Sequence, residues 1–245
     1  MSGPAATRVL DVVWHDLECG GYGDDLALWR ELAAAHPGPV LDVGAGTGRV
    51  TLDLARRGHP VVALDRDAAL LAELRTRAAG LPVAAVQADA RGFALGRQFA
   101  LILVPMQTVQ LLGGAEPRAG FLAAARAHLE PGGLVAIALA DALEAFDAEH
   151  DLAPLPDIRE LDGVVYSSRP VAVRDEGERV AIHRIREVVD PRGERTVSED
   201  VVRLDRVTAA LLAEEAEAHG LEAERAHGIP ASDEYVGSTV VMLRG

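Results

Sequence analysis

The stretch PVLDVGAGTGRVTLDLARRGHPVVALD, residues 39–65, decides the fold of this chain. Residues 40–43 form a short apolar run, interrupted by Asp42, of the kind that a parallel strand buries on both faces. Three glycines follow at every second position, and an apolar helical pattern continues to Gly58, a residue type that commonly ends helices. Residues 61–64 form a second apolar run that ends at Asp65. The pattern predicts a strand, a glycine turn, a helix and a second parallel strand.

The glycine turn predicts a ligand site. Gly44, Gly46 and Gly48 can adopt backbone angles that other residues resist, and they let a ligand lie against the main chain. The turn also presents the free N–H groups of the following helix. Asp65, at the carboxyl end of the second strand, can accept two hydrogen bonds from a ribose diol. Dinucleotides and S-adenosylmethionine both fit these features.

Residue 49 separates the two cofactor classes. The dinucleotide fingerprint G-x-G-x-x-G needs glycine at this position, where the chain has Arg49. Residues 42–48 instead read DVGAGTG, an acid followed by G-x-G-x-G, and in this the chain resembles the class I S-adenosylmethionine-dependent methyltransferases. Asp65 matches the second acid of that family, and residues 131–133, PGG, match its turn before the fifth strand. A nicotinamide-dependent oxidoreductase and a noncatalytic S-adenosylmethionine-binding protein remain the alternatives.

The resemblance implies an α/β architecture. It predicts a Rossmann-like, seven-stranded sheet in the order 3-2-1-4-5-7-6, with the last strand antiparallel. Four segments follow from it: an N-terminal helical lid at residues 1–37, the cofactor-binding core at 38–140, an inserted helix and antiparallel β meander covering the acceptor site at 141–206, and a last helix and β hairpin completing the core sheet at 207–245.

Local patterns place the remaining elements. One helix is predicted to begin at Asp24, and four more are predicted at 67–79, 121–129, 141–150 and 208–219. Core strands are predicted at 83–86, 99–104 and 134–139. The meander strands are predicted at 164–173, 180–189 and 196–204, and the final hairpin at 221–228 and 236–243.

The resemblance also implies site residues. Asp42 would order the glycine turn and face the methionine amino group, Asp65 would hold the ribose, and Asp89 and Ala90 would hold adenine. The full predicted cofactor-binding set is Asp42, Gly44, Ala45, Gly46, Asp65, Arg66, Asp89, Ala90 and Met106. For the methyl acceptor the predicted residues are Tyr22, Gln107 and Gln110.

The composition excludes several classes of binding partner. The formal net charge of −14 opposes a nucleic-acid substrate, which requires a basic footprint. A single cysteine, Cys19, excludes an internal disulfide and any cysteine-cluster metal site. No apolar run reaches membrane-spanning length and no signal-peptide pattern is seen. We therefore expect a cytoplasmic enzyme that uses S-adenosylmethionine on a small-molecule acceptor, with no membrane or metal partner; a homodimer stays open.

No catalytic residue is predicted. Methyl transfer from a sulfonium depends mainly on positioning, although a hydroxyl acceptor usually needs a base. His15, His150 and His183 are the candidate bases, but none lies in a recognisable motif. Residues 104–107, VPMQ, also lack the Asp/Asn-Pro-Pro-aromatic motif of enzymes that methylate nucleobase amino groups.

Overall fold

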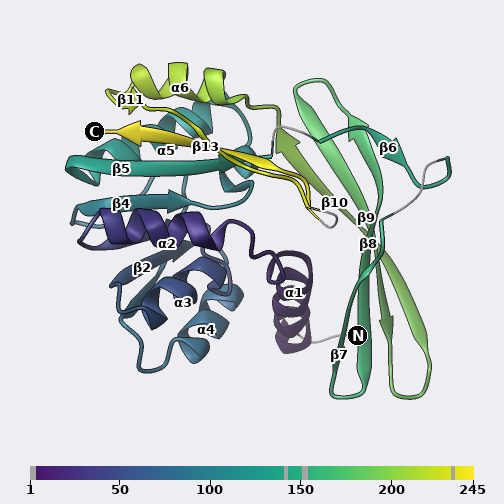
Figure 1. Ribbon diagram of the computed structural model, residues 1–245. Helices are drawn as coiled ribbons and strands as arrows, with labels where there is room; N and C mark the ends of the chain where they lie inside the picture. The colour runs from purple at the N-terminus through teal and green to yellow at the C-terminus, as the bar shows by residue number, and fades with distance from the viewer. Residues whose placement is uncertain (1–3, 141–142, 151–153, 233–234) are drawn as a thin grey trace.

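The computed structural model describes residues 4–140, 143–150, 154–232 and 235–245 (Figure 1). The chain forms a large mixed sheet covered by helices and a second, antiparallel sheet beside it, with helix α1 (Pro4–Cys19) between the two. Among the described helices, none is long and apolar enough to cross a membrane.

The large sheet has the order β11-β13-β5-β4-β1-β2-β3, and β12 pairs with β13. Its strands are β1 (Val40–Val43), β2 (Val61–Asp65), β3 (Val83–Gln87), β4 (Phe99–Val104), β5 (Leu129–Leu139), β11 (Glu222–Ala223), β12 (His227–Ile229) and β13 (Ser238–Arg244). β1 to β5 pair in parallel, whereas β13 is antiparallel to β5. The predicted order 3-2-1-4-5-7-6 is confirmed, with β11 and β13 as the sixth and seventh strands.

Helices cover both faces of this sheet (Figure 1). Side chains alternate along β1, so that Leu41 and Val43 pack with α5 (Ala115–Ala127) and α6 (Ala209–Glu217). Val40 packs on the opposite face with α2 (Leu26–Ala35) and α3 (Arg49–Arg56). α4 (Ala68–Arg77) buries its leucines against α3 and β3. Every residue of β1 and β4 is buried, as expected of central parallel strands.

The predicted meander is confirmed as the second sheet. It comprises β6 (Phe146–Asp147), β7 (Asp157–Leu161), β8 (Val164–Asp175), β9 (Arg179–Val189) and β10 (Arg195–Asp205), in the order β10-β9-β8-β6 with β7 also paired to β8. All its pairings are antiparallel.

Three local predictions differ from the structure. The described residues 143–150 contain no helix, because Phe146 and Asp147 pair instead with β8; residues 141 and 142 lie outside the described part of the chain. The final hairpin has two short strands, β11 and β12, on β13 in place of one long strand. The predicted helix 121–129 in fact starts at Ala115.

Helix α1 connects the two sheets. It contacts α4 on one side and β7 and β8 on the other (Figure 1). Glu18 accepts hydrogen bonds from Arg186 at 2.7 and 2.8 Å and from the Ser168 hydroxyl at 2.7 Å. The rings of Trp14 and Tyr166 meet edge to face at 5.6 Å. The helix is therefore anchored to the inserted sheet by both polar and aromatic contacts.

A buried ion pair anchors the N-terminal segment to the glycine turn. Arg49, the first residue of α3, donates to both carboxylate oxygens of Asp25 at 2.5 and 2.7 Å. The same guanidinium donates to the Tyr22 carbonyl oxygen at 3.0 Å and lies over the Tyr22 ring. The side chains of Asp25 and Arg49 are only 2% and 10% exposed, so the pair is largely shielded from water.

We predict that Asp25→Asn destabilises the protein by about 3 to 5 kcal/mol, because it leaves the guanidinium of Arg49 buried without its countercharge. Urea unfolding followed by circular dichroism measures the change. The matched control is Asp53→Asn, whose partners Arg30 and Arg57 are exposed, and which should change the free energy of unfolding much less. Equal effects of the two substitutions would contradict the assignment.

Candidate functional site

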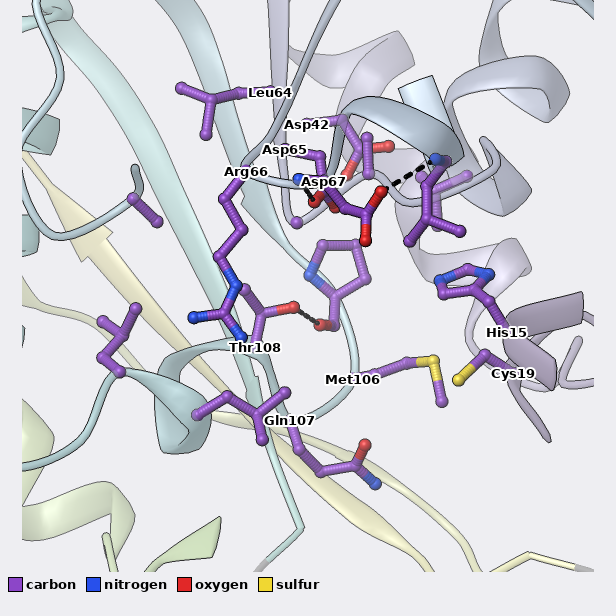
Figure 2. A pocket seen from close by; sticks show the side chains of 18 of the residues that line it. His15, Cys19, Asp42, Leu64, Asp65, Arg66, Asp67, Met106, Gln107 and Thr108 are labelled. Atoms are coloured by element: carbon purple, nitrogen blue, oxygen red, sulfur yellow. Dashed lines mark hydrogen bonds between the residues drawn. The ribbon is translucent and has the colours of Figure 1, made fainter. Parts of the chain in front are cut away.

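A pocket of about 360 Å³ opens at the carboxyl ends of β1, β2 and β4 (Figure 2). This is the edge at which open α/β sheets bind ligands. Its lining includes His15 and Cys19 from α1, Asp42, Gly44, Ala45 and Arg49, Leu64 to Asp67, Ala88 to Arg91, and Pro105 to Thr108. All the predicted cofactor-binding residues line this pocket except Gly46.

The glycine turn requires its glycines. Gly44 and Gly46 have φ of +74° and +54°, values that L side chains rarely adopt. A Cβ on Gly44 would lie 2.6 Å from the Thr108 side chain, and one on Gly46 would lie 2.2 Å from Nε2 of His15. Side chains from two other elements therefore approach the turn closely, on the side where the pocket opens.

Asp65 organises the turn and the neighbouring helix. One of its carboxylate oxygens accepts from Gly46 N–H and the other from Asp67 N–H, both at 2.8 Å. Asp67 in turn accepts from Ala69 and Leu70 N–H and so caps α4. Each Asp65 oxygen keeps a lone pair that can accept a further hydrogen bond inside the pocket.

Asp42 is a buried carboxyl group, and one of its oxygens has no hydrogen-bond partner among the described residues. It is 1% exposed, and its Oδ2 accepts from the Thr51 hydroxyl at 2.6 Å. Its Oδ1 is buried and has no hydrogen-bond partner among the described residues. Burial raises the pKa of Asp42 to about 6, although the hydrogen bond from Thr51 acts in the opposite direction. The pocket thus contains an acceptor that a ligand donor can satisfy.

The far end of the pocket is formed by residues that follow β3. Asp89 and Ala90 line it, as does Arg66 after β2. Asp89 is half-exposed and forms an ion pair with Arg91, and the hydrogen bonds from Arg91 lower the pKa of Asp89 to about 2. The Asp89 carboxylate is therefore already engaged, at a position where solvent and a ligand can both reach it.

Met106 and Gln107 lie where two cavities adjoin. Both residues line the main pocket and also a second cavity of about 60 Å³. Met106 has φ of +55°, an unusual angle for a residue with a side chain. Tyr22 lines the second cavity, not the main pocket, and its ring packs 5.0 Å from that of Tyr235. Of the residues predicted for the acceptor, Tyr22 and Gln107 thus share one cavity.

Gln110, predicted to bind the acceptor, lines neither cavity. Its side chain is 3% exposed, and Nε2 donates to the carbonyl oxygens of Ala140 at 3.1 Å and Asp205 at 3.2 Å. Its Oε1 accepts from Ala140 N–H at 2.8 Å. The amide joins the 3₁₀ turn η1 (Thr108–Leu111) to the ends of β5 and β10.

Two residues of α1 line the pocket, the candidate base His15 and Cys19, for which the sequence suggested no role in the site. Figure 2 shows His15 and Cys19 beside Met106. Burial lowers the pKa of His15, against the opposing influence of Asp16 and Asp65. Burial also raises the pKa of the Cys19 thiol to about 11, so that it stays protonated at neutral pH. Their spacing of four places both on one helix face, but nothing in the sequence indicated that this face borders the pocket.

The other candidate histidines lie outside the pocket lining. His150 is exposed, and His183 belongs to β9 of the inserted sheet. Ligand atoms of Asp147, Glu149 and His150 lie within 4.8 Å of one another, a grouping that the sequence did not suggest. None of the three lines the pocket, and Glu149 and His150 are exposed.

Residues 40–133 match the family model described as "Methyltransferase domain". A solved structure similar in fold is an amino pentose methyltransferase from Micromonospora echinaspora bound to S-adenosylmethionine: TM-score 0.70, 23% identity, covering 100% of this chain and 98% of that one. The fold similarity thus extends through the inserted sheet and both termini.

Curated relatives match over shorter stretches. The cypemycin N-terminal methyltransferase of a Streptomyces species is 31% identical over 105 residues, 43% of each chain. A tRNA1(Val) adenine(37)-N6-methyltransferase of Bacteroides thetaiotaomicron is 38% identical over 76 residues, 29% of this chain and 31% of that protein. The chain therefore spans less than half the length of these curated relatives.

We predict that Asp42→Asn stabilises the protein at pH 8 and not at pH 4. The folded-state pKa is raised from 3.8 to about 6, so the folded protein holds more protons than the unfolded chain between these values, and the wild type loses stability as pH rises through this range. The full shift corresponds to about 3 kcal/mol. Urea unfolding of both proteins at the two pH values measures it; a stabilisation independent of pH would contradict the assignment.

The geometry and the comparisons agree at residues 40–133. The sheet order, the acid and glycine turn after β1, and the second acid at the end of β2 all occur within or around the matched domain. The same architecture surrounds bound S-adenosylmethionine in the structure from Micromonospora echinaspora. Residues 40–133 are therefore similar to a methyltransferase domain, and the fold of the chain is that of the S-adenosylmethionine-bound structure from Micromonospora echinaspora.

Proposed function

We propose that this protein transfers the methyl group of S-adenosylmethionine to an amine of a small-molecule acceptor. The observation that carries the proposal is the unpartnered Oδ1 of Asp42 within a pocket at the glycine turn. A buried carboxylate oxygen without a donor is costly, and an ammonium group satisfies it. S-adenosylmethionine has such a group on its methionine portion.

The pocket offers a partner for each part of this cofactor. Asp42 would accept from the ammonium group, and Gly44, Ala45 and Gly46 would lie against the methionine chain. Asp65 would accept from the ribose hydroxyls with the lone pairs left after its two backbone hydrogen bonds. Arg66, Asp89 and Ala90 would surround adenine, and Met106 would lie near the sulfonium. When bound, the cofactor supplies an electrophilic methyl group on a good leaving group.

The second cavity would receive the acceptor. It shares Met106 and Gln107 with the main pocket, so a molecule in it would lie next to the proposed cofactor site. Tyr22 and Tyr235 give it an aromatic wall, and Gln107 and Ser238 add polar side chains. An aromatic wall with a few hydrogen-bonding groups is a lining typical of small-molecule sites.

An amine acceptor is favoured by the relatives. The Streptomyces relative is named for an N-terminal methylation and the Micromonospora structure for an amino pentose. The tRNA methyltransferase suggests nucleic acid as the other candidate acceptor. The net charge of −14 opposes that candidate, because phosphate backbones need a cationic surface.

We predict that the wild-type protein binds S-adenosylmethionine and that Asp65→Ala weakens binding at least tenfold while the protein stays folded. The substitution removes the ribose acceptor and the partner of Gly46 N–H. Isothermal titration calorimetry measures the affinity, and circular dichroism checks the fold. Labelled methyl transfer to a panel of amino sugars, short peptides and alkylamines tests the acceptor class.

The control is Asp175→Ala, which removes an exposed carboxylate of the inserted sheet far along the chain from the pocket. It should leave the affinity unchanged. Binding of NAD in preference to S-adenosylmethionine, or equal cofactor affinities of the Asp65→Ala protein and the wild type, would refute the cofactor assignment. Methyl transfer to RNA but to no small amine would refute the acceptor assignment.

A further inference from the structure

Met106 has a backbone conformation that its residue type rarely adopts. Its φ of +55° lies in the left-handed region, where Asn and Asp are tolerated but a long side chain costs energy. Among the non-glycine residues that the structure describes, Asp162 alone shares this region, with φ of +52°. Asp162 lies in the exposed turn between β7 and β8 and is followed by Gly163, a pair typical of tight hairpin turns. The conformation of Met106 has no such local explanation.

Hydrogen bonds on both sides of Met106 hold this conformation. The Pro105 carbonyl oxygen accepts from the Thr108 hydroxyl at 2.9 Å and from the Thr108 N–H at 3.5 Å. The Gln107 carbonyl oxygen accepts from the Gln110 N–H at 2.9 Å, and the Gln110 side chain is itself fixed to the ends of β5 and β10. Strained residues persist where the surrounding structure determines them in this way, and they cluster at functional sites.

This conformation places the Met106 side chain at the boundary between the two cavities. Met106 and Gln107 form that boundary, because both residues line the main pocket and the second cavity. Figure 2 shows the Met106 thioether pointing toward Cys19, which lines the pocket from the end of α1. The side chain therefore extends from the loop after β4 toward α1, along the boundary.

The two cavities differ in what they can hold. The main pocket has a volume of about 360 Å³, and small-molecule sites typically have about 300 to 1,000 Å³. The second cavity has a volume of about 60 Å³, whereas a single water molecule needs about 10 to 15 Å³. Of the two, only the main pocket can hold a whole cofactor. The second cavity has room for a few atoms, such as an amine group with its nearest substituents.

Group transfer between the two cavities has to take place at the boundary. Reacting atoms approach to about 3 to 3.5 Å before a group is transferred. A cofactor in the main pocket and an acceptor in the second cavity can come this close where Met106 and Gln107 lie. A group on the cofactor sulfur that points toward the acceptor therefore lies beside the Met106 side chain. A methyl group needs little space there, whereas a larger group has to enter the volume of the thioether chain.

We propose that Met106 is a specificity-determining residue, whose side chain limits the group on the cofactor sulfur to a methyl group. The inference rests on the proposed function, in which the main pocket holds S-adenosylmethionine and the second cavity holds the acceptor. The hydrogen bonds around Met106 fix its backbone, so the side chain starts at the boundary whether or not an acceptor is bound. Glycine at this position would join the two cavities, and glycine adopts a φ of this sign readily.

Binding of a cofactor analogue with a larger group on sulfur tests this limit without any turnover. The probes are S-adenosylmethionine and the analogue that carries a benzyl group in place of the methyl group, which has the same charge. The wild type should bind the benzyl analogue about tenfold or more weakly, because the ring has to enter occupied space. Met106→Gly should bind the two compounds within about threefold of each other, because that space is then open. Isothermal titration calorimetry measures the affinities.

Two control variants separate the effect of the side chain from that of the backbone. Met106→Leu keeps a side chain of similar volume on the same strained backbone, so it should discriminate as the wild type does. Asp162→Gly relaxes the other left-handed residue, which lies in an exposed turn and lines neither cavity, and it should also keep the wild-type preference. Circular dichroism and urea unfolding verify that each variant is folded.

Three results would count against the inference and leave the proposed function intact. These are equal affinities of the wild type for the two compounds, a Met106→Gly protein that discriminates as the wild type does, and a Met106→Leu protein that loses the discrimination. The last result would show that the volume of the side chain does not set the limit. A wild type that does not bind S-adenosylmethionine would overturn the proposed function, and this inference with it.

Discussion

The buried ion pair between Arg49 and Asp25 is the interaction on which the geometry of the pocket depends. Arg49 begins α3 directly after the glycine turn, and its guanidinium reaches the segment between α1 and α2 through Asp25 and the Tyr22 carbonyl. The N-terminal wall of the pocket, with His15 and Cys19, is therefore connected to the turn that it faces. In sequence Arg49 served only to exclude a dinucleotide fingerprint, whereas in the structure its side chain forms a link that glycine could not make.

The elements that were predictable depend on short-range patterns. The first strand, glycine turn and helix follow from apolar spacing within residues 39–65, and β4 matches its predicted bounds of 99–104. The meander strands follow from alternation and turn residues, and β8, β9 and β10 each extend the predicted ranges by one or two residues. The predicted cofactor positions mostly line one pocket, because parallel strands bring their carboxyl ends to the same edge.

What could not be predicted depends on contacts between distant segments. His15 enters the pocket because α1 packs between α4 and the inserted sheet, and its partner Thr47 is 32 positions away. Gln110 looked like a polar loop residue, yet its amide is satisfied by Ala140 and Asp205, which are 30 and 95 positions along the chain. No local pattern distinguishes a glutamine that faces a cavity from one that joins two strand ends, since both are polar residues after a strand.

The hydrogen bonds between η1 and β10 have a thermodynamic consequence for the inserted sheet. Asp205, at the end of β10, accepts from the N–H groups of Gly113 and Gly114 and through its carbonyl from Gln110, so the last strand of the insertion and the wall of the pocket share one network. A ligand that moved η1 would also change the hydrogen bonds that hold the end of β10. By linkage, the factor by which an acceptor alters the affinity for the cofactor equals the factor by which the cofactor alters the affinity for the acceptor. The inserted sheet is in this sense attached to the wall of the pocket through Asp205 and Gln110.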